Sequence, residues 1–251
     1  MAGHSHWANI AHKKGRADKK RAAVYSKLNK AIIIAAKRGG GNPDANLALR
    51  YALDKARKQN LPRDTIERAI KKGTGELASD NFEELLYEGY GPFGVAVICD
   101  VLTDNRNRTA PEVRKIFETY GGNLGATGCV GWMFDRKGMF LIPATSTNED
   151  SLMEIALEAG ADDVKLEGES FQVLCAVDQF DTVSKAIEAA GLTTTVSEFA
   201  RIPQNTVELG GAEDAKAILE LMDALEENED IQAVTANFNI PEEVMANLAN
   251  S

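Results

Sequence analysis

The sequence predicts an α+β protein in which an N-terminal three-helix bundle precedes two α+β domains of the ferredoxin-like, split βαβ kind, one inserted in the other. Two observations predict this. The first 72 residues have helical periodicity and carry 18 basic residues against five acidic ones, a net charge of +13. The whole chain is −10, which leaves −23 for residues 73–251, where strand-like and helix-like segments alternate. A chain of 251 residues has room for two or three domains.

Three helices are expected in the basic part, over Lys19–Lys37, from Asn42 to about Gln59, and from Pro62 to Gly73. In the first, apolar residues recur at helical spacing, and three glycines follow it. In the second, Asn42 would act as the cap and Pro43 would lie in the first turn. In the third, Asp64 and Glu67 have the spacing of a capping box. Residues 1–18 lack periodicity, so we expect a flexible arm there.

The acidic part is expected to contain four helices and eight strands. The helices are expected at 109–120, 148–159, 180–190 and 212–226, and the strands at 84–90, 95–101, 130–134, 139–143, 163–166, 171–177, 194–202 and 231–238. Thr109 and Glu112 have capping-box spacing, and a turn at Asp135–Gly138 would separate two strands. From Met139 the order is β-α-β-β-α-β, the split βαβ pattern. The expected domains are residues 1–75, residues 76–136 joined with 203–251, and the inserted residues 137–202.

The charge of the basic part predicts a polyanionic partner. So few acids compensate it that nucleic acid is the expected partner, while the acidic part would repel phosphate. The alternative is a solvated basic face without a partner. Trp7 could stack on a nucleobase or tuck against the first helix. The residues assigned to nucleic-acid binding are Trp7, Lys13, Lys14, Arg16, Lys19, Lys20, Arg21, Lys27, Lys30, Arg63, Lys71 and Lys72.

A second candidate contact is the loop Asp104–Thr109, which joins a strand to a helix. Arg106 and Arg108 stand beside the free N–H groups of the helix start, so they are a possible contact for an anion, RNA or a protein partner. Capping accounts for Thr109 without requiring either arginine. The glycine-rich run 121–131 follows a helix and precedes a strand, the reverse of a dinucleotide fingerprint, so we expect a turn-rich loop.

The sequence predicts neither catalysis nor a cofactor. Every histidine lies in the first twelve residues, so no Ser/His/Asp or Cys/His set forms, and His4, His6 and His12 lack a fourth metal ligand. The longest apolar run, Ala31–Ala36, is far shorter than the roughly 20 residues that span a bilayer. No secretory signal is evident, and three dispersed cysteines fit a reducing compartment. We therefore expect a cytoplasmic monomer without catalytic residues, metal or cofactor.

Five motifs together are specific to a known family: Gly3–Ile10 (GHSHWANI), Ile66–Gly73 (IERAIKKG), Tyr87–Pro92 (YEGYGP), Thr103–Thr109 (TDNRNRT) and Gly121–Gly125 (GGNLG). On these the chain resembles the YebC family over essentially its whole length. The resemblance implies a helical N-terminal domain followed by two α+β domains. Bacterial members are described as probable transcriptional regulators that bind DNA and are also linked to ribosomes stalled at proline-rich stretches; a mitochondrial relative is the translational activator of cytochrome c oxidase. The chain departs from the family at His6, usually basic, and at Leu47-Ala48, usually proline–arginine.

The leading hypothesis is a non-enzymatic, nucleic-acid-binding regulator of gene expression that acts through Met1–Lys72. Phosphate attraction is independent of sequence, so charge alone leaves promoter DNA and ribosomal RNA open as targets. The lack of a base-reading motif favours RNA and the ribosome. The alternative is a protein-interaction module whose acidic α+β domains bind a protein partner.

Overall fold

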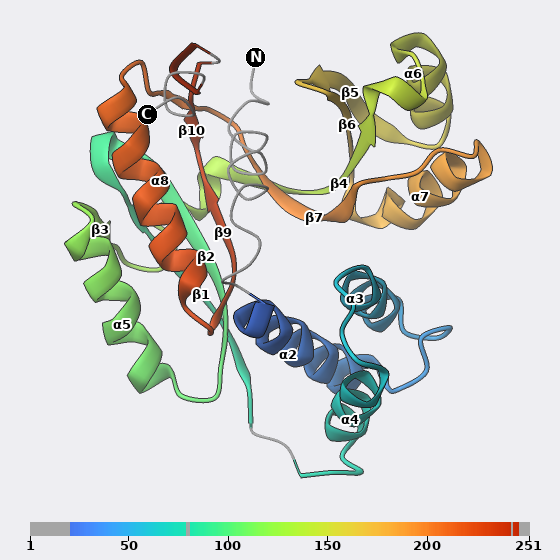
Figure 1. The fold of residues 1–251 in the computed structure, drawn as a ribbon, viewed down its shortest axis with the longest axis horizontal. Helices are drawn as coiled ribbons and strands as arrows, with labels where there is room; N and C mark the ends of the chain where they lie inside the picture. The colour runs from blue at the N-terminus through green and yellow to red at the C-terminus, as the bar shows by residue number, and fades with distance from the viewer. Residues whose placement is uncertain (1–20, 79–80, 242, 246–251) are drawn as a thin grey trace. The chain divides into compact units, whose positions relative to one another are not determined.

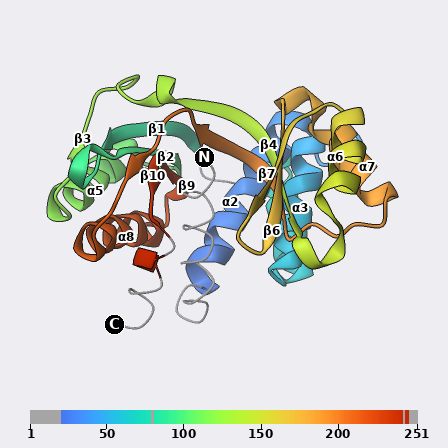
Figure 2. The same ribbon diagram turned by 90° about the horizontal axis from the view of Figure 1, so that it is seen from above.

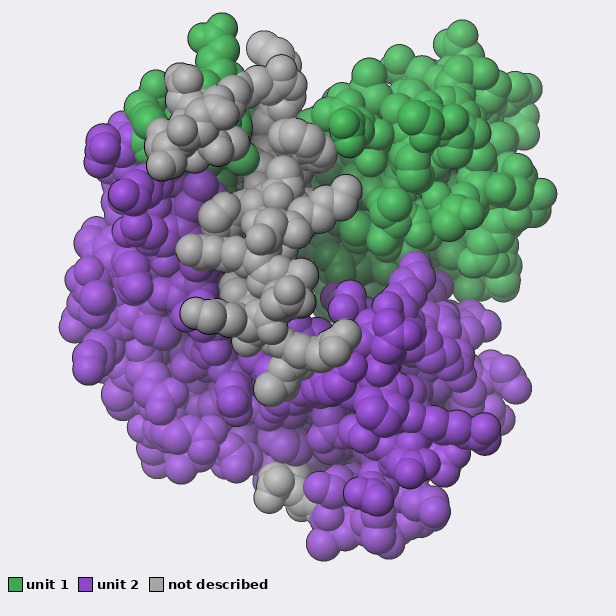
Figure 3. All heavy atoms as spheres, viewed as in Figure 1, with its two compact units in different colours: residues 1–12, 131–212, 236–251 green, residues 13–130, 213–235 purple. Residues whose placement is uncertain are grey.

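The structure, a computed structural model, describes residues 21–78, 81–241 and 243–245 (Figure 1). The described chain forms two compact units, coloured separately in Figure 3. Unit 1 holds residues 131–212, 236–241 and 243–245, and unit 2 holds residues 21–78, 81–130 and 213–235. The arm expected at residues 1–18 lies outside the described residues. The three-domain division expected from the sequence stays a prediction.

Three helices open unit 2: α2 (Arg21–Gly39), α3 (Leu47–Lys58) and α4 (Arg63–Thr74). We call them the bundle, and α2 packs against both of the others. Their buried apolar side chains form one core, which includes Leu28, Ile32, Ile33, Leu49, Leu53, Ala56, Leu61 and Ala69. Gly73 permits the close approach of α4 to α2, because a Cβ there would stand 2.5 Å from the Ile33 carbonyl oxygen.

One of these helices, α3, begins elsewhere than the sequence predicts. α3 begins at Leu47 rather than near Asn42, and its cap is Asn46, whose side-chain oxygen accepts a hydrogen bond from the Leu49 N–H. The Asn46 amide also donates to the carbonyls of Ala35 and Gly40, so this buried residue ties α3 to the end of α2. That tertiary role decides where α3 begins.

The capping box expected at the start of α4 is also wrong. Pro62 is the cap residue and makes no side-chain capping hydrogen bond. Glu67 instead pairs with Arg63 at 2.9 Å, one turn earlier on the surface of the helix.

The first sheet, also in unit 2, contains β1 (Glu83–Tyr90), β2 (Ala96–Thr103), β3 (Asn123–Leu124) and β9 (Ile231–Ala236) in the order β3-β1-β2-β9. Helices α5 (Arg106–Thr119) and α8 (Ala212–Glu227) lie on one face of it (Figure 2). Two glycines explain the fit. A Cβ on Gly89 would meet the Phe117 ring of α5, and a Cβ on Gly91 would meet Ile218 and Leu221 of α8. Gly91 directly follows β1 with an extended backbone, and residues two apart along an extended chain face the same side, so both helices pack there.

The second sheet, in unit 1, contains β4 (Phe134–Pro143), β5 (Ala161–Glu167), β6 (Ser170–Cys175) and β7 (Val196–Pro203) in the order β5-β6-β4-β7. Helices α6 (Glu149–Glu158) and α7 (Phe180–Ala189) cover one face of it (Figure 2). The pairings of β4 with β6 and β7, and of β5 with β6, are antiparallel, which confirms the split βαβ pattern and the α+β class. A short parallel pair, β8 (Val207–Glu208) with β10 (Phe238–Asn239), completes the unit.

The predicted turn at Asp135–Gly138 is wrong, because β4 runs without interruption from Phe134 to Pro143 and pairs with β7. Gly138 serves packing instead of a turn: its bare backbone lies against the Phe180 ring, which stacks on Phe140 at 4.6 Å between centroids. The strand expected at 130–134 is replaced by a single 3₁₀ turn at Gly131–Met133 ahead of β4. The glycine-rich run 121–131 is otherwise loop, with a short strand, β3, inside it.

Candidate functional site

The loop that holds the two candidate arginines leads from β2 into α5. Asn105 caps α5, because its side-chain oxygen accepts a hydrogen bond from the Arg108 N–H at 3.2 Å. The predicted capping box of Thr109 with Glu112 is therefore wrong, and Thr109 lies buried inside the first turn. Its side chain is used for a contact far away in the sequence, with Asp230.

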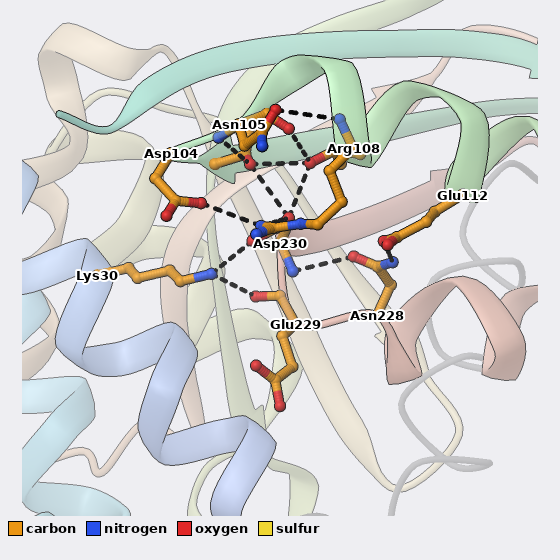
Figure 4. A network of polar contacts seen from close by, with 10 residues as sticks. Lys30, Asp104, Asn105, Arg108, Glu112, Asn228, Glu229 and Asp230 are labelled. Atoms are coloured by element: carbon orange, nitrogen blue, oxygen red, sulfur yellow. Dashed lines mark hydrogen bonds and ion pairs between the residues drawn. The ribbon is translucent and has the colours of Figure 1, made fainter. Parts of the chain in front are cut away.

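Asp230, directly before β9, is the centre of a polar network (Figure 4). Its Oδ1 accepts a hydrogen bond from Lys30 Nζ at 2.7 Å, and its Oδ2 accepts one from Arg108 Nη2 at 2.7 Å. The hydroxyls of Thr109 and Thr103 lie 2.8 and 3.1 Å from Oδ2. The Asp230 side chain is only 6% exposed. One buried carboxylate thus receives a cation from α2, a cation from α5 and two hydroxyls.

Backbone and amide contacts fix the position of this carboxylate. The Leu102 N–H donates to the Asp230 carbonyl at 2.7 Å, and the Asp230 N–H donates to the Asn228 side-chain oxygen at 3.0 Å. The Asn228 amide in turn donates to Glu112 of α5 at 3.2 Å. Residues 226–230, which we call the α8–β9 turn, are therefore held against β2 and α5.

The network keeps Asp230 ionised. Burial alone would raise the pKa of Asp230, but hydrogen bonds from Lys30, Arg108 and Thr109 outweigh burial and lower it from 3.8 to about 2. The hydrogen bond to Asp230, with a smaller contribution from Asp104, raises the pKa of Arg108. Arg108 also pairs with Asp104 at 3.0 Å. Arg108 is therefore tied into the fold, whereas Arg106 is exposed and forms no ion pair with any residue that the structure describes.

An open cavity of about 450 Å³ lies over this network. It is lined by Lys30, Phe82, Asp104, Arg108, Glu112, Asn228, Glu229 and Asp230. Four carboxylates face two cations there, and both cations are paired with Asp230. The net negative charge of the lining does not favour an anion. The side chains that line the cavity pair with one another and so join α2, α5 and the α8–β9 turn.

Two lysines assigned to nucleic-acid binding have partners inside the fold. Lys27 Nζ donates to the Glu226 carbonyl at 2.6 Å, and Lys30 Nζ donates to the Glu229 carbonyl at 3.1 Å as well as to Asp230. The Lys30 side chain is 13% exposed. Nothing in the local sequence around these lysines indicates a partner some 200 positions away, so sequence reasoning could not have found this role.

The other assigned residues differ in their surroundings. Arg63 is 90% exposed on its side chain and pairs with Glu67, Lys71 is exposed, and Lys72 is half-buried. Arg21 is the first residue of α2. The side chain of Arg21, and the whole of Trp7, Lys13, Lys14, Arg16, Lys19 and Lys20, lie outside what the structure describes.

Helices α3 and α4 add two cations that the sequence reasoning did not single out, Lys58 and Arg68. Both are exposed, and neither they nor Lys71 and Lys72 form an ion pair with any described residue. On α4, Arg68, Lys71 and Lys72 have the i, i+3, i+4 spacing of neighbouring positions; Arg68 and Lys71 are exposed, whereas Lys72, three positions after the buried Ala69, is half-buried. The spacing of the apolar residues in each helix could have placed Lys58 and Arg68 on the solvent side.

The described residues include no group of three or more His, Cys, Asp or Glu side chains that could hold a metal ion. Within the same residues, no helix combines the length and the apolar composition that crossing a membrane requires.

Comparison with known proteins identifies the family. Residues 5–76 match the model described as the TACO1/YebC protein N-terminal domain, and residues 82–238 match the one described as the TACO1/YebC second and third domain. The chain belongs to the TACO1/YebC family. This confirms the resemblance drawn from the five motifs. Lys30 lies within the first matched range, and Arg108 and Asp230 lie within the second.

Relatives in this family match the chain from end to end. A protein of Desulfatibacillum aliphaticivorans is 51% identical over 98% of this chain and 99% of its own length. One of Natranaerobius thermophilus is 52% identical over the same shares, and both are named probable transcriptional regulatory protein. The crystal structure of a conserved hypothetical protein from Aquifex aeolicus has a TM-score of 0.86 at 46% identity, over 96% of this chain and 99% of that one. The TACO1/YebC fold predicted here is therefore confirmed.

The network predicts different roles for the two arginines of α5. Arg108→Gln should lower the free energy of unfolding by about 1–2 kcal/mol, because a buried carboxylate loses a partner while the exposed part of Arg108 is screened by water. Arg106→Gln, the matched control, should stay within about 0.5 kcal/mol of the wild type. Urea denaturation measures both. Equal stability of the two variants would contradict the role given to Arg108.

The low pKa of Asp230 predicts a pH dependence. The folded-state pKa is about 2 and the ordinary value is 3.8, so the contribution to stability is complete above pH 5 and falls as the pH drops toward 2. The stability advantage of the wild type over Asp230→Asn should shrink by about 1 kcal/mol between pH 5 and pH 3. Urea denaturation across that range is the measurement. If the stability difference between the wild type and Asp230→Asn did not change with pH, the network would not be what lowers the pKa of Asp230.

Proposed function

We propose that this protein is a non-enzymatic, nucleic-acid-binding regulator of gene expression that acts through its basic N-terminal part. The observation that carries the proposal is the set of exposed cations on α3 and α4, Lys58, Arg68 and Lys71, which no described acid neutralises. Cations left open to water on a folded surface can exchange their counterions for phosphates. The names of the relatives from Desulfatibacillum and Natranaerobius, probable transcriptional regulatory proteins, support the same class of function.

The charge of the remaining chain supports a directed contact. Helix α8 carries six acidic residues and one lysine over Ala212–Glu227, and such a surface repels a polyanion. Lys27 and Lys30 already have internal acceptors, so the proposal now rests on α3, α4 and the basic residues before α2. Long-range attraction and repulsion together would orient nucleic acid toward the bundle.

For the target we favour RNA, including ribosomal RNA, and a cytoplasmic site of action. The sequence contains no zinc finger, helix-turn-helix signature or other base-reading motif, and contacts to phosphate alone carry no sequence information. Duplex DNA is the competing target. The two differ in salt dependence, with about −0.7 per phosphate contact for single strands and −0.9 for B-form DNA.

The proposal predicts a change in salt dependence. Replacing Lys58, Arg68 and Lys71 with alanine should reduce the slope of log affinity against log salt by about 2–3 and weaken all sequences alike. The matched control replaces Arg114, Lys115 and Lys216, three exposed cations of α5 and α8, and should leave the slope unchanged. Fluorescence anisotropy with single-stranded RNA and with duplex DNA measures both. An unchanged slope in the first variant, or an equal change in the control, would overturn the proposal.

A further inference from the structure

The bundle has a core of its own. Its buried apolar side chains come from α2, α3, α4 and the short connections between them, and from beyond α4 the cluster includes only Phe82, partly buried, among the described residues. A helical unit that buries its own apolar faces does not depend on a neighbour for its fold. Contact between such a unit and the rest of the chain is then free to form and break.

Lysine and arginine side chains of α2 form hydrogen bonds and ion pairs that join the bundle to the rest of unit 2. Arg38 pairs with Glu84 at 2.8 Å, but the two side chains are 69% and 44% exposed, so water screens this pair. The contacts of Lys27 with the Glu226 carbonyl and of Lys30 with the Asp230 carboxylate are the more buried ones. Among these, Lys30 with Asp230 joins two full charges, both of them largely shielded from water.

The sharing of Asp230 makes this contact releasable. When Lys30 leaves, the Asp230 carboxylate still has Arg108 at 2.7 Å and the hydroxyls of Thr103 and Thr109. Asp230 therefore does not become an unpaired buried charge, the state that makes breaking a buried ion pair so costly. Lys30 lies on a surface of α2 and gains hydration when it is released. The carboxylate is thus satisfied in both states, as a two-state element requires.

We propose that the Lys30–Asp230 contact is a latch that holds the bundle docked on the α8–β9 turn. With the latch closed, the bundle and the β3-β1-β2-β9 sheet move as one body. With the latch open, the bundle moves as an intact body of its own, and the ammonium groups of Lys27 and Lys30 face water. The latch stands independently of nucleic-acid binding, because it rests on contacts within the chain.

The test separates the two cations that share the carboxylate. Lys30→Gln removes the bundle's partner, whereas Arg108→Gln, the matched control, removes the sheet-side partner and leaves Lys30 on Asp230. Nitrogen-15 relaxation of the full chain gives the rotational correlation time of amides in α2–α4 relative to amides in β1 and β2. The ratio should be close to one in the wild type and in Arg108→Gln, and clearly below one in Lys30→Gln. Unchanged chemical shifts within the bundle core verify that the bundle stays folded.

Three results would overturn the latch. The first is a ratio that stays at one in Lys30→Gln. The second is a ratio already below one in the wild type, which would mean that the contact does not hold the bundle. The third is an equal fall in Arg108→Gln, which would attribute the motion to general loosening of the network.

Discussion

The arrangement of unit 2 depends on one carboxylate. Asp230 accepts hydrogen bonds from a lysine of α2 and an arginine of α5, and it lies where α8 leads into β9. Asp230 also accepts from two hydroxyls, and the result is an anion whose pKa is lowered to about 2 in spite of burial. Lys30 of the bundle and Asp230 beside β9, which are 200 positions apart in the sequence, are joined at this point.

The described cations of the basic part fall into two groups, according to whether they contact the α8–β9 turn. Lys27 and Lys30 contact the α8–β9 turn, whereas Lys58, Arg68 and Lys71 lie exposed on α3 and α4. The high charge of the first 72 residues therefore has two physical uses. Lys27 and Lys30 are paired within the fold, and Lys58, Arg68 and Lys71 stay open to the nucleic acid that we propose as the partner.

Local patterns in the sequence were enough for the fold class, the split βαβ order and the family, because periodicity and motifs lie in contiguous residues. Local patterns were insufficient wherever a residue distant in the sequence determines the role of a side chain. Thr109 has the spacing of a cap, but it faces Asp230, so Asn105 caps α5 instead. Gly138 looks like a turn residue, but it makes room for Phe180. Lys30 looks like an ordinary surface cation, and its partner lies 200 positions away.

The measurement that tests this account most directly is a double-mutant cycle between Lys30 and Asp230. Unfolding free energies of the wild type, Lys30→Gln, Asp230→Asn and the double variant give their coupling energy. Because both side chains are largely buried, the account predicts a favourable coupling of about 1–3 kcal/mol. The same cycle between Lys37 and Asp230, with an exposed lysine on α2, should give none. Additive effects of Lys30→Gln and Asp230→Asn would contradict the central place given to this contact.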